Sequence, residues 1–262
     1  MTDLAYEDQG SGEPVVFIAG RGGAGRGWHL QQVPAFLAAG YRTITFDNRG
    51  IGATADADGF TTETMVEDTA ALIETLGAAP ARIVAMSMGA YIAQELMLAR
   101  PELVSSAVLM ATRGRLDRVR SFFYTAEIAL VAAGVELPAE YEAKVRLLEN
   151  FSPKTLNDDQ IVDDWIAMFT TWPIKPTAGL RCQLDIGPAS SRLAAYRNIR
   201  HPVLVIGFAD DVLTPPHLCR EVAEALPHGR YLQIADAGHL GFLERGAAVN
   251  AAALEFFADT WG

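Results

Sequence analysis

The sequence predicts an α/β fold, in which helices cover both faces of a mostly parallel sheet. Short apolar and β-branched runs recur along the chain and alternate with longer segments of helical period, which is typical of such a sheet. A chain of 262 residues with 50% hydrophobic content is also large enough to bury one core of this kind. We therefore expect one domain that is interrupted by an insertion.

Six apolar runs are predicted to be the buried strands of this sheet. Each is as short as buried strands usually are, and most are bounded by glycine, proline or polar residues. In chain order they cover residues 15–19, 42–46, 83–86, 106–110, 203–206 and 231–234.

Helices are expected between these runs. Apolar residues recur at helical spacing from Met65 to Leu76, and Gly77 follows where a left-handed C-cap would lie. The segments 216–226 and 247–257 are also apolar on one side. These helices should flank the sheet.

The regular alternation fails between residues 113 and 200, where several stretches have the period of amphipathic helices. We interpret residues 113–200 as a helical cap, and residues 1–112 and 201–262 as the core. Aromatic rings in the cap could line an apolar pocket, or they could simply hold the cap together. They are Phe122, Phe123, Tyr124, Trp165, Phe169 and Trp172.

One serine has the setting of a nucleophile. Ser87 lies between the apolar run 83–86 and an amphipathic segment, with the small residues Ala85 and Gly89 two positions away on each side. A sharp strand-to-helix turn needs small residues at these positions and exposes the serine oxygen. The alternative is a serine that only caps a helix.

Two carboxylates and a histidine follow later strands. Asp210 and Asp211 come after the run 203–206, and His239 comes after the run 231–234. Catalytic groups lie outside the carboxyl ends of parallel strands. A serine needs a base that a third group orients, and the order Ser, Asp, His is the one expected of this fold. The pattern predicts His239 as general base and leaves both aspartates open as the acid.

The whole chain resembles a capped α/β-hydrolase of the esterase, lactonase and thioesterase kind. The resemblance rests on the segments around Ser87, the aspartates and His239, and on residues 47–52, which are similar to the family's DxRGxG loop. Alignment with the family pattern VLVIHGxxDxxxPP places Asp211 at the acid position.

The resemblance also implies a mechanism. The helical cap would be inserted after the sixth strand, and the amides of Arg21 and Met88 would hold an oxyanion. The chain would hydrolyse an ester, lactone or thioester through an acyl-enzyme on Ser87, without a metal or organic cofactor. The expected substrate is small to medium and largely apolar, with Trp28, Phe123 and Trp165 as the residues that contact it.

Composition limits the kinds of molecule that we expect this protein to bind. A net charge of −11 repels phosphate backbones and anionic lipid, so nucleic acid and membranes are poor partners. The N-terminus has no signal-peptide pattern, and the two cysteines form no ligand cluster, so a cytoplasmic protein is expected. Its partner would be a small-molecule substrate, which a carrier protein could hold as a linked acyl group.

Four arginines lie within residues 113–120 of this acidic chain. Most such runs are solvated surface with weak ion pairs. The alternative is that Arg113 or Arg115, at the edge where the strand 106–110 ends, recognises a carboxylate or phosphate of the substrate.

Three other functions fit parts of the sequence. Gly20, Gly22 and Gly25 match the GxGxxG pattern of dinucleotide sites, with Asp47 at the next strand end, but Gly27 delays the helix that this site needs. A non-catalytic ligand binder would not need the serine, aspartate and histidine together. In a cofactor-free lyase or oxygenase, His239 would remove a proton and Ser87 would only donate a hydrogen bond.

Overall fold

A seven-stranded sheet lies at the centre of the computed structural model, which describes residues 4–172 and 177–260. The strand order is β1-β3-β2-β4-β5-β6-β7. β1 runs antiparallel to β3, and the other neighbours pair in parallel, so the predicted mostly parallel sheet is confirmed. The strands are β1 (Tyr6–Gln9), β2 (Pro14–Ile18), β3 (Arg42–Phe46), β4 (Ala81–Met86), β5 (Val104–Met110), β6 (Val203–Phe208) and β7 (Gly229–Ile234).

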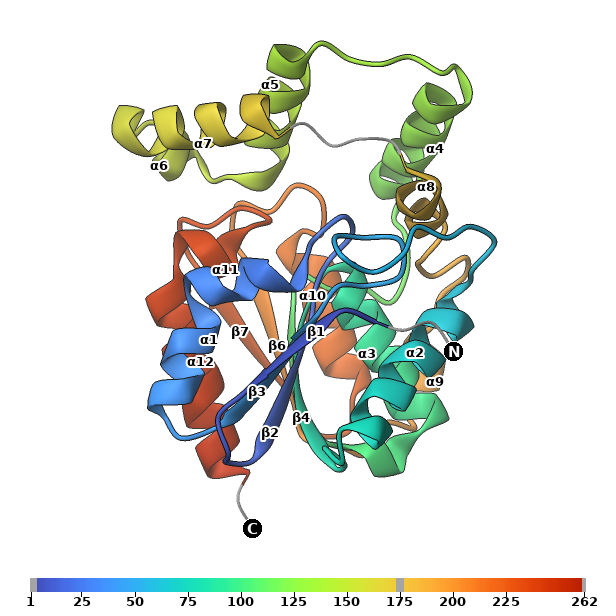
Figure 1. Ribbon diagram of the computed structural model, residues 1–262, viewed down its shortest axis with the longest axis vertical. Helices are drawn as coiled ribbons and strands as arrows, with labels where there is room; N and C mark the ends of the chain where they lie inside the picture. The colour runs from blue at the N-terminus through green and yellow to red at the C-terminus, as the bar shows by residue number, and fades with distance from the viewer. Residues whose placement is uncertain (1–3, 173–176, 261–262) are drawn as a thin grey trace.

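Helices cover both faces of the sheet, as predicted (Figure 1). Alternate strand residues point to opposite faces, so Val16 and Ile83 pack with α2 and α3, whereas Phe17 and Val84 pack with α1 and α12. The flanking elements are the 3₁₀ helices η1 (Gly25–Leu30) and η2 (Pro101–Leu103) and the helices α1 (Gln32–Ala38), α2 (Thr62–Thr75), α3 (Met88–Ala99), α10 (Pro216–Ala225), α11 (Gly241–Glu244) and α12 (Gly246–Asp259).

The predicted elements agree with the structure to within a few residues. All six predicted strands are present, the segments 216–226 and 247–257 form α10 and α12, and Gly77 follows α2 with a φ of 58°. β1 was not predicted, because this antiparallel edge strand is polar and largely exposed and carries no apolar pattern.

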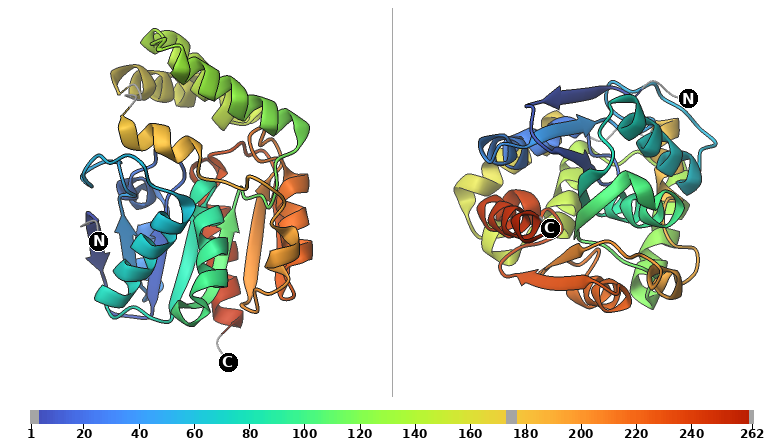
Figure 2. Two further views of the ribbon diagram at one scale, coloured as in Figure 1. Left: turned by 90° about the vertical axis from the view of Figure 1, so that its right-hand side faces the viewer. Right: turned by 90° about the horizontal axis from the view of Figure 1, so that it is seen from below.

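The insertion lies between β5 and β6 and is helical throughout its described elements. It consists of α4 (Arg118–Ala132), α5 (Ala139–Asn150), α6 (Pro153–Leu156), α7 (Asp159–Thr171), α8 (Ala178–Leu184) and α9 (Leu193–Tyr196). Helices α4 to α7 lie beyond the carboxyl ends of the parallel strands (Figures 1 and 2). The division into a core and a cap at residues 113 and 200 stays a prediction.

One detail of the expected topology is wrong. The insertion was expected after the sixth strand, but in the described chain it follows β5, the fifth. The described chain has the antiparallel strand β1 and the parallel strands β2 to β5 before the insertion, one strand fewer than the resemblance implied. Across the described residues, no helix is long and apolar enough to cross a bilayer.

Candidate active site

The turn between β4 and α3 holds Ser87 in a strained backbone conformation. Ser87 has φ 54° and ψ −116°, outside the regions that an L-residue prefers. A Cβ added to Gly89 would lie 2.2 Å from the carbonyl oxygen of Ile18, so only glycine fits two residues after the serine. Ala85, two residues before it, is fully buried within β4, where its methyl group is accommodated.

The hydroxyl of Ser87 contacts a histidine and does not cap α3. Its Oγ lies 3.1 Å from Nε2 of His239, and its side chain makes no capping hydrogen bond to the helix. The structure therefore supports the strand-to-helix turn over the alternative of a simple N-cap serine.

Asp211 holds the other side of the imidazole. Its Oδ2 lies 2.8 Å from Nδ1 of His239, and its Oδ1 accepts hydrogen bonds from the backbone amides of Leu213 and Thr214 at 2.8 Å each. Asp211 is 3% exposed and His239 is 7% exposed. An unbroken line of hydrogen bonds thus runs from a buried carboxylate through an imidazole to a serine oxygen.

The electrostatic environment keeps Asp211 ionised. Burial is the largest single influence and opposes ionisation. The attraction of His239 and the hydrogen bonds from His239 and Thr214 together outweigh it, so the pKa of Asp211 lies below its ordinary value. The neighbouring Asp210 is only half-buried, and the hydrogen bonds of the described residues include none to its side chain. Of the two open candidates, the structure places Asp211 against His239.

Thr214 is a member of this site that the sequence analysis missed. Its Oγ1 donates a hydrogen bond to Oδ2 of Asp211 at 2.7 Å and lies 3.1 Å from Nδ1 of His239. The signal was available, because an aspartate followed three residues later by a threonine and then by Pro215 is typical of a local side-chain turn.

The loop after β2 lies against the serine turn. A Cβ on Gly20 would be 3.3 Å from Cβ of Ser87, which places the following residue, Arg21, beside Ser87. Met88 begins α3, where backbone amides have no partner within the helix. Among the hydrogen bonds of the described residues, neither the Arg21 amide nor the Met88 amide is a donor. The binding of an oxyanion by these two amides stays a prediction.

The glycine-rich loop is held by Asp47 and is not built as a dinucleotide site. Asp47 Oδ1 accepts from the amide of Gly25 and Oδ2 accepts from the amide of Ala53, at 2.8 Å each. The carboxylate that mimicked a ribose ligand therefore ties two loops together. Gly25 begins the 3₁₀ helix η1, which ends at Leu30, so no long helix begins at this loop. A Cβ on Gly25 would lie 2.8 Å from the backbone nitrogen of Phe46.

Glu244 links the insertion by hydrogen bonds to the histidine loop, the segment around His239. The sequence analysis also missed this residue. Glu244 Oε1 accepts hydrogen bonds from the amide and the hydroxyl of Ser152, and Oε2 accepts from the amide of Gly238 at 2.6 Å. The amide of Leu240 donates to the carbonyl of Asn150 at 2.9 Å. The loop that carries His239 is thus positioned partly by residues of the insertion.

Replacing Glu244 by glutamine should therefore loosen the histidine loop. The new amide group would face an N–H or O–H donor, at Gly238 or at Ser152, instead of accepting from it. We expect kcat to fall by roughly 10-fold, less than the about 100-fold that a 1 Å misplacement costs, and the free energy of unfolding to fall by about 1–2 kcal/mol. Ester turnover and denaturant melts would measure both. Glu255→Gln, at an exposed position on α12, is the matched control, and equal effects of the two variants would contradict the positioning role.

The three predicted substrate contacts lie in different environments. Trp28 is 1% exposed and packs between Phe17 and Phe242 in the core, so the prediction that it contacts substrate is wrong. Its place in the chain, beside the glycine loop, does not reveal that its ring points inward. The ring of Trp165 packs at a tilt against that of Phe151 within the insertion, with the ring centroids 4.6 Å apart, and helps to hold the helices together. Phe123 on α4 is 37% exposed.

The arginines of residues 113–120 have different contacts in the structure. Arg115 forms a two-bonded ion pair with Glu221 on α10 at 2.7 and 2.5 Å, so it is occupied. Arg120 pairs with Asp117 and donates to the carbonyl of Val212. Arg113 follows β5 at the edge of the sheet where Ser87 and Asp211 lie.

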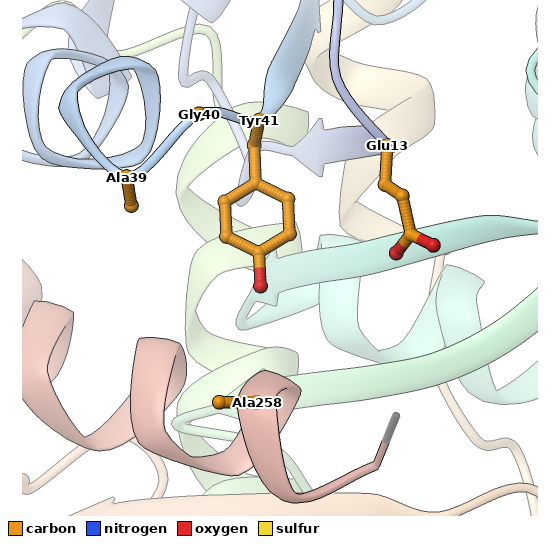
Figure 3. A pocket seen from close by; sticks show the side chains of 5 residues that line it. All are labelled: Glu13, Ala39, Gly40, Tyr41 and Ala258. Carbon is orange, nitrogen blue, oxygen red and sulfur yellow. The ribbon is translucent and has the colours of Figure 1, made fainter. Parts of the chain in front are cut away.

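A hollow lies at the amino ends of the parallel strands, opposite the end where Ser87 and His239 lie. Its lining comes from the segments that lead into β2 and β3 and from the end of α12 (Figure 3), and consists of Glu13, Ala39, Gly40, Tyr41 and Ala258. Ligands of open parallel sheets bind at the carboxyl edge, and this hollow is at the other edge, so we assign it no role. In the described parts of the chain, no group of His, Cys, Asp or Glu side chains is arranged to hold a metal ion.

Comparison with known proteins identifies related chains. A model described as the alpha/beta hydrolase family matches residues 15–252. A Mycobacterium tuberculosis H37Rv protein, provisionally named non-heme bromoperoxidase BpoC, is 74% identical over 99% of both chains. Its crystal structure superposes with a TM-score of 0.97 over 99% of this chain and 97% of that chain, at 73% identity. A protein of Azorhizobium caulinodans, provisionally named carbamate hydrolase RutD, is 30% identical over 90% of this chain and 88% of its own.

Proposed function

The chain belongs to the alpha/beta hydrolase family, and we propose that it is a serine hydrolase of carboxylic esters, lactones or thioesters. The observation that carries this proposal is the line of hydrogen bonds from Asp211 through His239 to the oxygen of Ser87. A serine oxygen that contacts an imidazole, which a carboxylate in turn orients, is the arrangement that nucleophilic catalysis requires.

The proposed reaction has two halves. His239 accepts the proton of Ser87 as the serine oxygen attacks the carbonyl carbon, and the amides of Arg21 and Met88 donate to the oxyanion that forms. The imidazolium then protonates the leaving alcohol or thiol, and Ser87 is left acylated. A water molecule then attacks the acyl group in the same way, with His239 as base, which releases the acid and restores the serine. Asp211 keeps the imidazole proton on Nδ1, so that Nε2 can accept.

We expect a substrate of small to medium size with a largely apolar body. Phe123 is exposed on the same turn of α4 as Arg120, which contacts the backbone next to Asp211. Leu240 follows His239 and packs with apolar side chains of the insertion. An acyl group linked to a carrier protein and a cytoplasmic location stay predictions.

Covalent labelling tests the proposal directly. A fluorophosphonate probe should label the wild-type protein at Ser87, which peptide mass spectrometry would locate, and preincubation with an ester substrate should slow the labelling. Absence of labelling in a folded protein that still turns over substrate would favour the cofactor-free lyase or oxygenase. No labelling and no turnover would favour a ligand binder.

The name of the mycobacterial relatives favours a second candidate that uses the same serine. Hydrogen peroxide could attack the acyl-enzyme instead of water, which would release a peracid and free Ser87. The peracid, bromide and a proton would then give the carboxylic acid and hypobromous acid. Bromination that requires both an ester that acylates Ser87 and Ser87 itself would support this candidate, and bromination that persists in Ser87→Ala would exclude it.

A further inference from the structure

Arg113 is a partly buried cation that has no partner among the described side chains. Its Nε is buried and has no hydrogen-bond acceptor, and within the described residues no ion pair or hydrogen bond involves its guanidinium. A desolvated charge that lacks a partner is costly, so its retention calls for a reason. The other arginines around it are engaged: Arg21 with Glu127, Arg115 with Glu221 and Arg120 with Asp117.

The fold places Arg113 beside the reacting groups. Met110, at the end of β5, is the register partner of Met86 in β4 and of Ile206 in β6, the strands that lead to Ser87 and Asp211. The carbonyl of Arg113 accepts a hydrogen bond from Gln94 on α3, which fixes the start of its side chain. On the insertion side, Nη2 lies 3.7 Å from where a Cβ of Gly187 would be.

The charges that face Arg113 come from three segments. Burial lowers its pKa most, the cations Arg21 and Arg120 lower it further, and the anions Asp211 and Glu127 raise it. Both of these carboxylates already bind other groups, since Asp211 holds His239 and Glu127 holds Arg21. Neither carboxylate therefore forms an ion pair with Arg113, although both attract its charge from a distance.

We propose that Arg113 binds a carboxylate group of the substrate, so that the preferred substrates are acyl compounds with one free carboxylate, such as half-esters or half-thioesters of dicarboxylic acids. This inference rests on the proposed function. The flat fork of a guanidinium binds a carboxylate through two parallel hydrogen bonds.

The charges around Arg113 favour a substrate group that carries a single negative charge. Asp211, Glu127 and Glu149 are near the site, and burial followed by repulsion from Glu127 raises the pKa of Glu149. One unpaired arginine can neutralise one charge. A phosphate dianion would leave a second charge uncompensated among these carboxylates.

The test compares two matched esters of 4-methylumbelliferone, the hexanoate and the adipate half-ester, which has the same acyl length and ends in a carboxylate. We would measure kcat/KM for both in the wild type, Arg113→Ala and Arg113→Lys. Arg118→Ala, which removes an exposed arginine on the first turn of α4, is the matched control. Competition by adipate and by inorganic phosphate would separate the two kinds of anion.

We expect Arg113→Ala to lower kcat/KM for the half-ester by about 10- to 100-fold and to leave the hexanoate within about twofold, with partial recovery in Arg113→Lys. The control should change neither substrate. The Tm of Arg113→Ala should not fall, because an unpaired buried charge is removed.

Equal losses for both esters, or none for either, would overturn the inference while leaving the hydrolase intact. Stronger competition by phosphate than by adipate would also overturn it. If the wild type hydrolyses neither ester and a fluorophosphonate does not label Ser87, the proposed function itself fails.

Discussion

Replacing Ser87 by alanine should lower kcat for ester hydrolysis by about 10³-fold or more, because the variant lacks the oxygen that attacks the carbonyl. Alanine keeps the Cβ and the same backbone preferences as serine, and the Ser87 hydroxyl makes no capping bond to α3. The fold should therefore be unaffected, and the Tm should stay within a few degrees of the wild type. Initial rates with a neutral ester, measured at saturating substrate, would give the change in kcat.

Ser105→Ala is the matched control, since Ser105 is an exposed serine of β5. It should retain full activity. Near-normal hydrolysis by Ser87→Ala would contradict covalent catalysis and would favour a mechanism in which His239 acts alone as a base and Ser87 only donates a hydrogen bond. Loss of activity in both variants would point to misfolding instead.

Asp211→Asn should have an effect of the same order, a loss of about 10³-fold or more in kcat. All four contacts of this carboxylate are with donors: the amides of Leu213 and Thr214 on Oδ1, and the Thr214 hydroxyl and His239 Nδ1 on Oδ2. An amide group at the Oδ2 position would force Nδ1 to accept. The imidazole proton would then move to Nε2, which could no longer take the proton of Ser87.

Asp210→Asn is the matched control for this variant, because Asp210 is adjacent in sequence and only half-buried. We expect it to cost far less activity. A larger loss in Asp210→Asn than in Asp211→Asn would mean that the other carboxylate orients the histidine in solution. Both variants should be compared by kcat with one ester and by denaturant melts.

The depressed pKa of Asp211 adds a pH dependence with a definite sign. A carboxyl group whose folded pKa is lower than its unfolded value stabilises the folded state fully above the unfolded pKa, which is about 3.9. That contribution is lost as the pH falls through the lower folded value. The contribution of this carboxylate to the stability of the wild type should thus be fully present above about pH 5 and should shrink in stronger acid, as denaturant melts of wild type and Asp211→Asn across pH would measure.

The parts of the site that the sequence could predict depend on local geometry. The sharp turn at Ser87 requires small residues on either side, and a Cβ on Gly89 would lie only 2.2 Å from the carbonyl oxygen of Ile18. The placement of His239 and the aspartates after strands follows from the rule that parallel strands end at one edge. The choice of Asp211 over Asp210 came from the resemblance, and the structure places Asp211 against His239.

The contacts that sequence reasoning missed or misplaced depend on distant segments. Glu244 is on α11 and binds Ser152 of the insertion, 92 residues away in the chain. Trp28 follows the glycine loop, yet its ring is enclosed by Phe17 and Phe242. Nothing in the local pattern distinguishes such a core ring from one that lines a binding site, because both uses need the same apolar side chain.

Neighbouring residues alone specify the alternation of strands and helices, the turn at Ser87 and the order of Ser87, Asp211 and His239 along the chain. Periodicity and local backbone constraints depend on residues that are close together in the chain, so the sequence is enough to predict them. The pairing of Arg115 with Glu221, and the lack of such a partner for Arg113 in the described chain, become evident only in the folded protein. Whether a charge is neutralised depends on which remote side chain folds against it, and sequence spacing does not specify that contact.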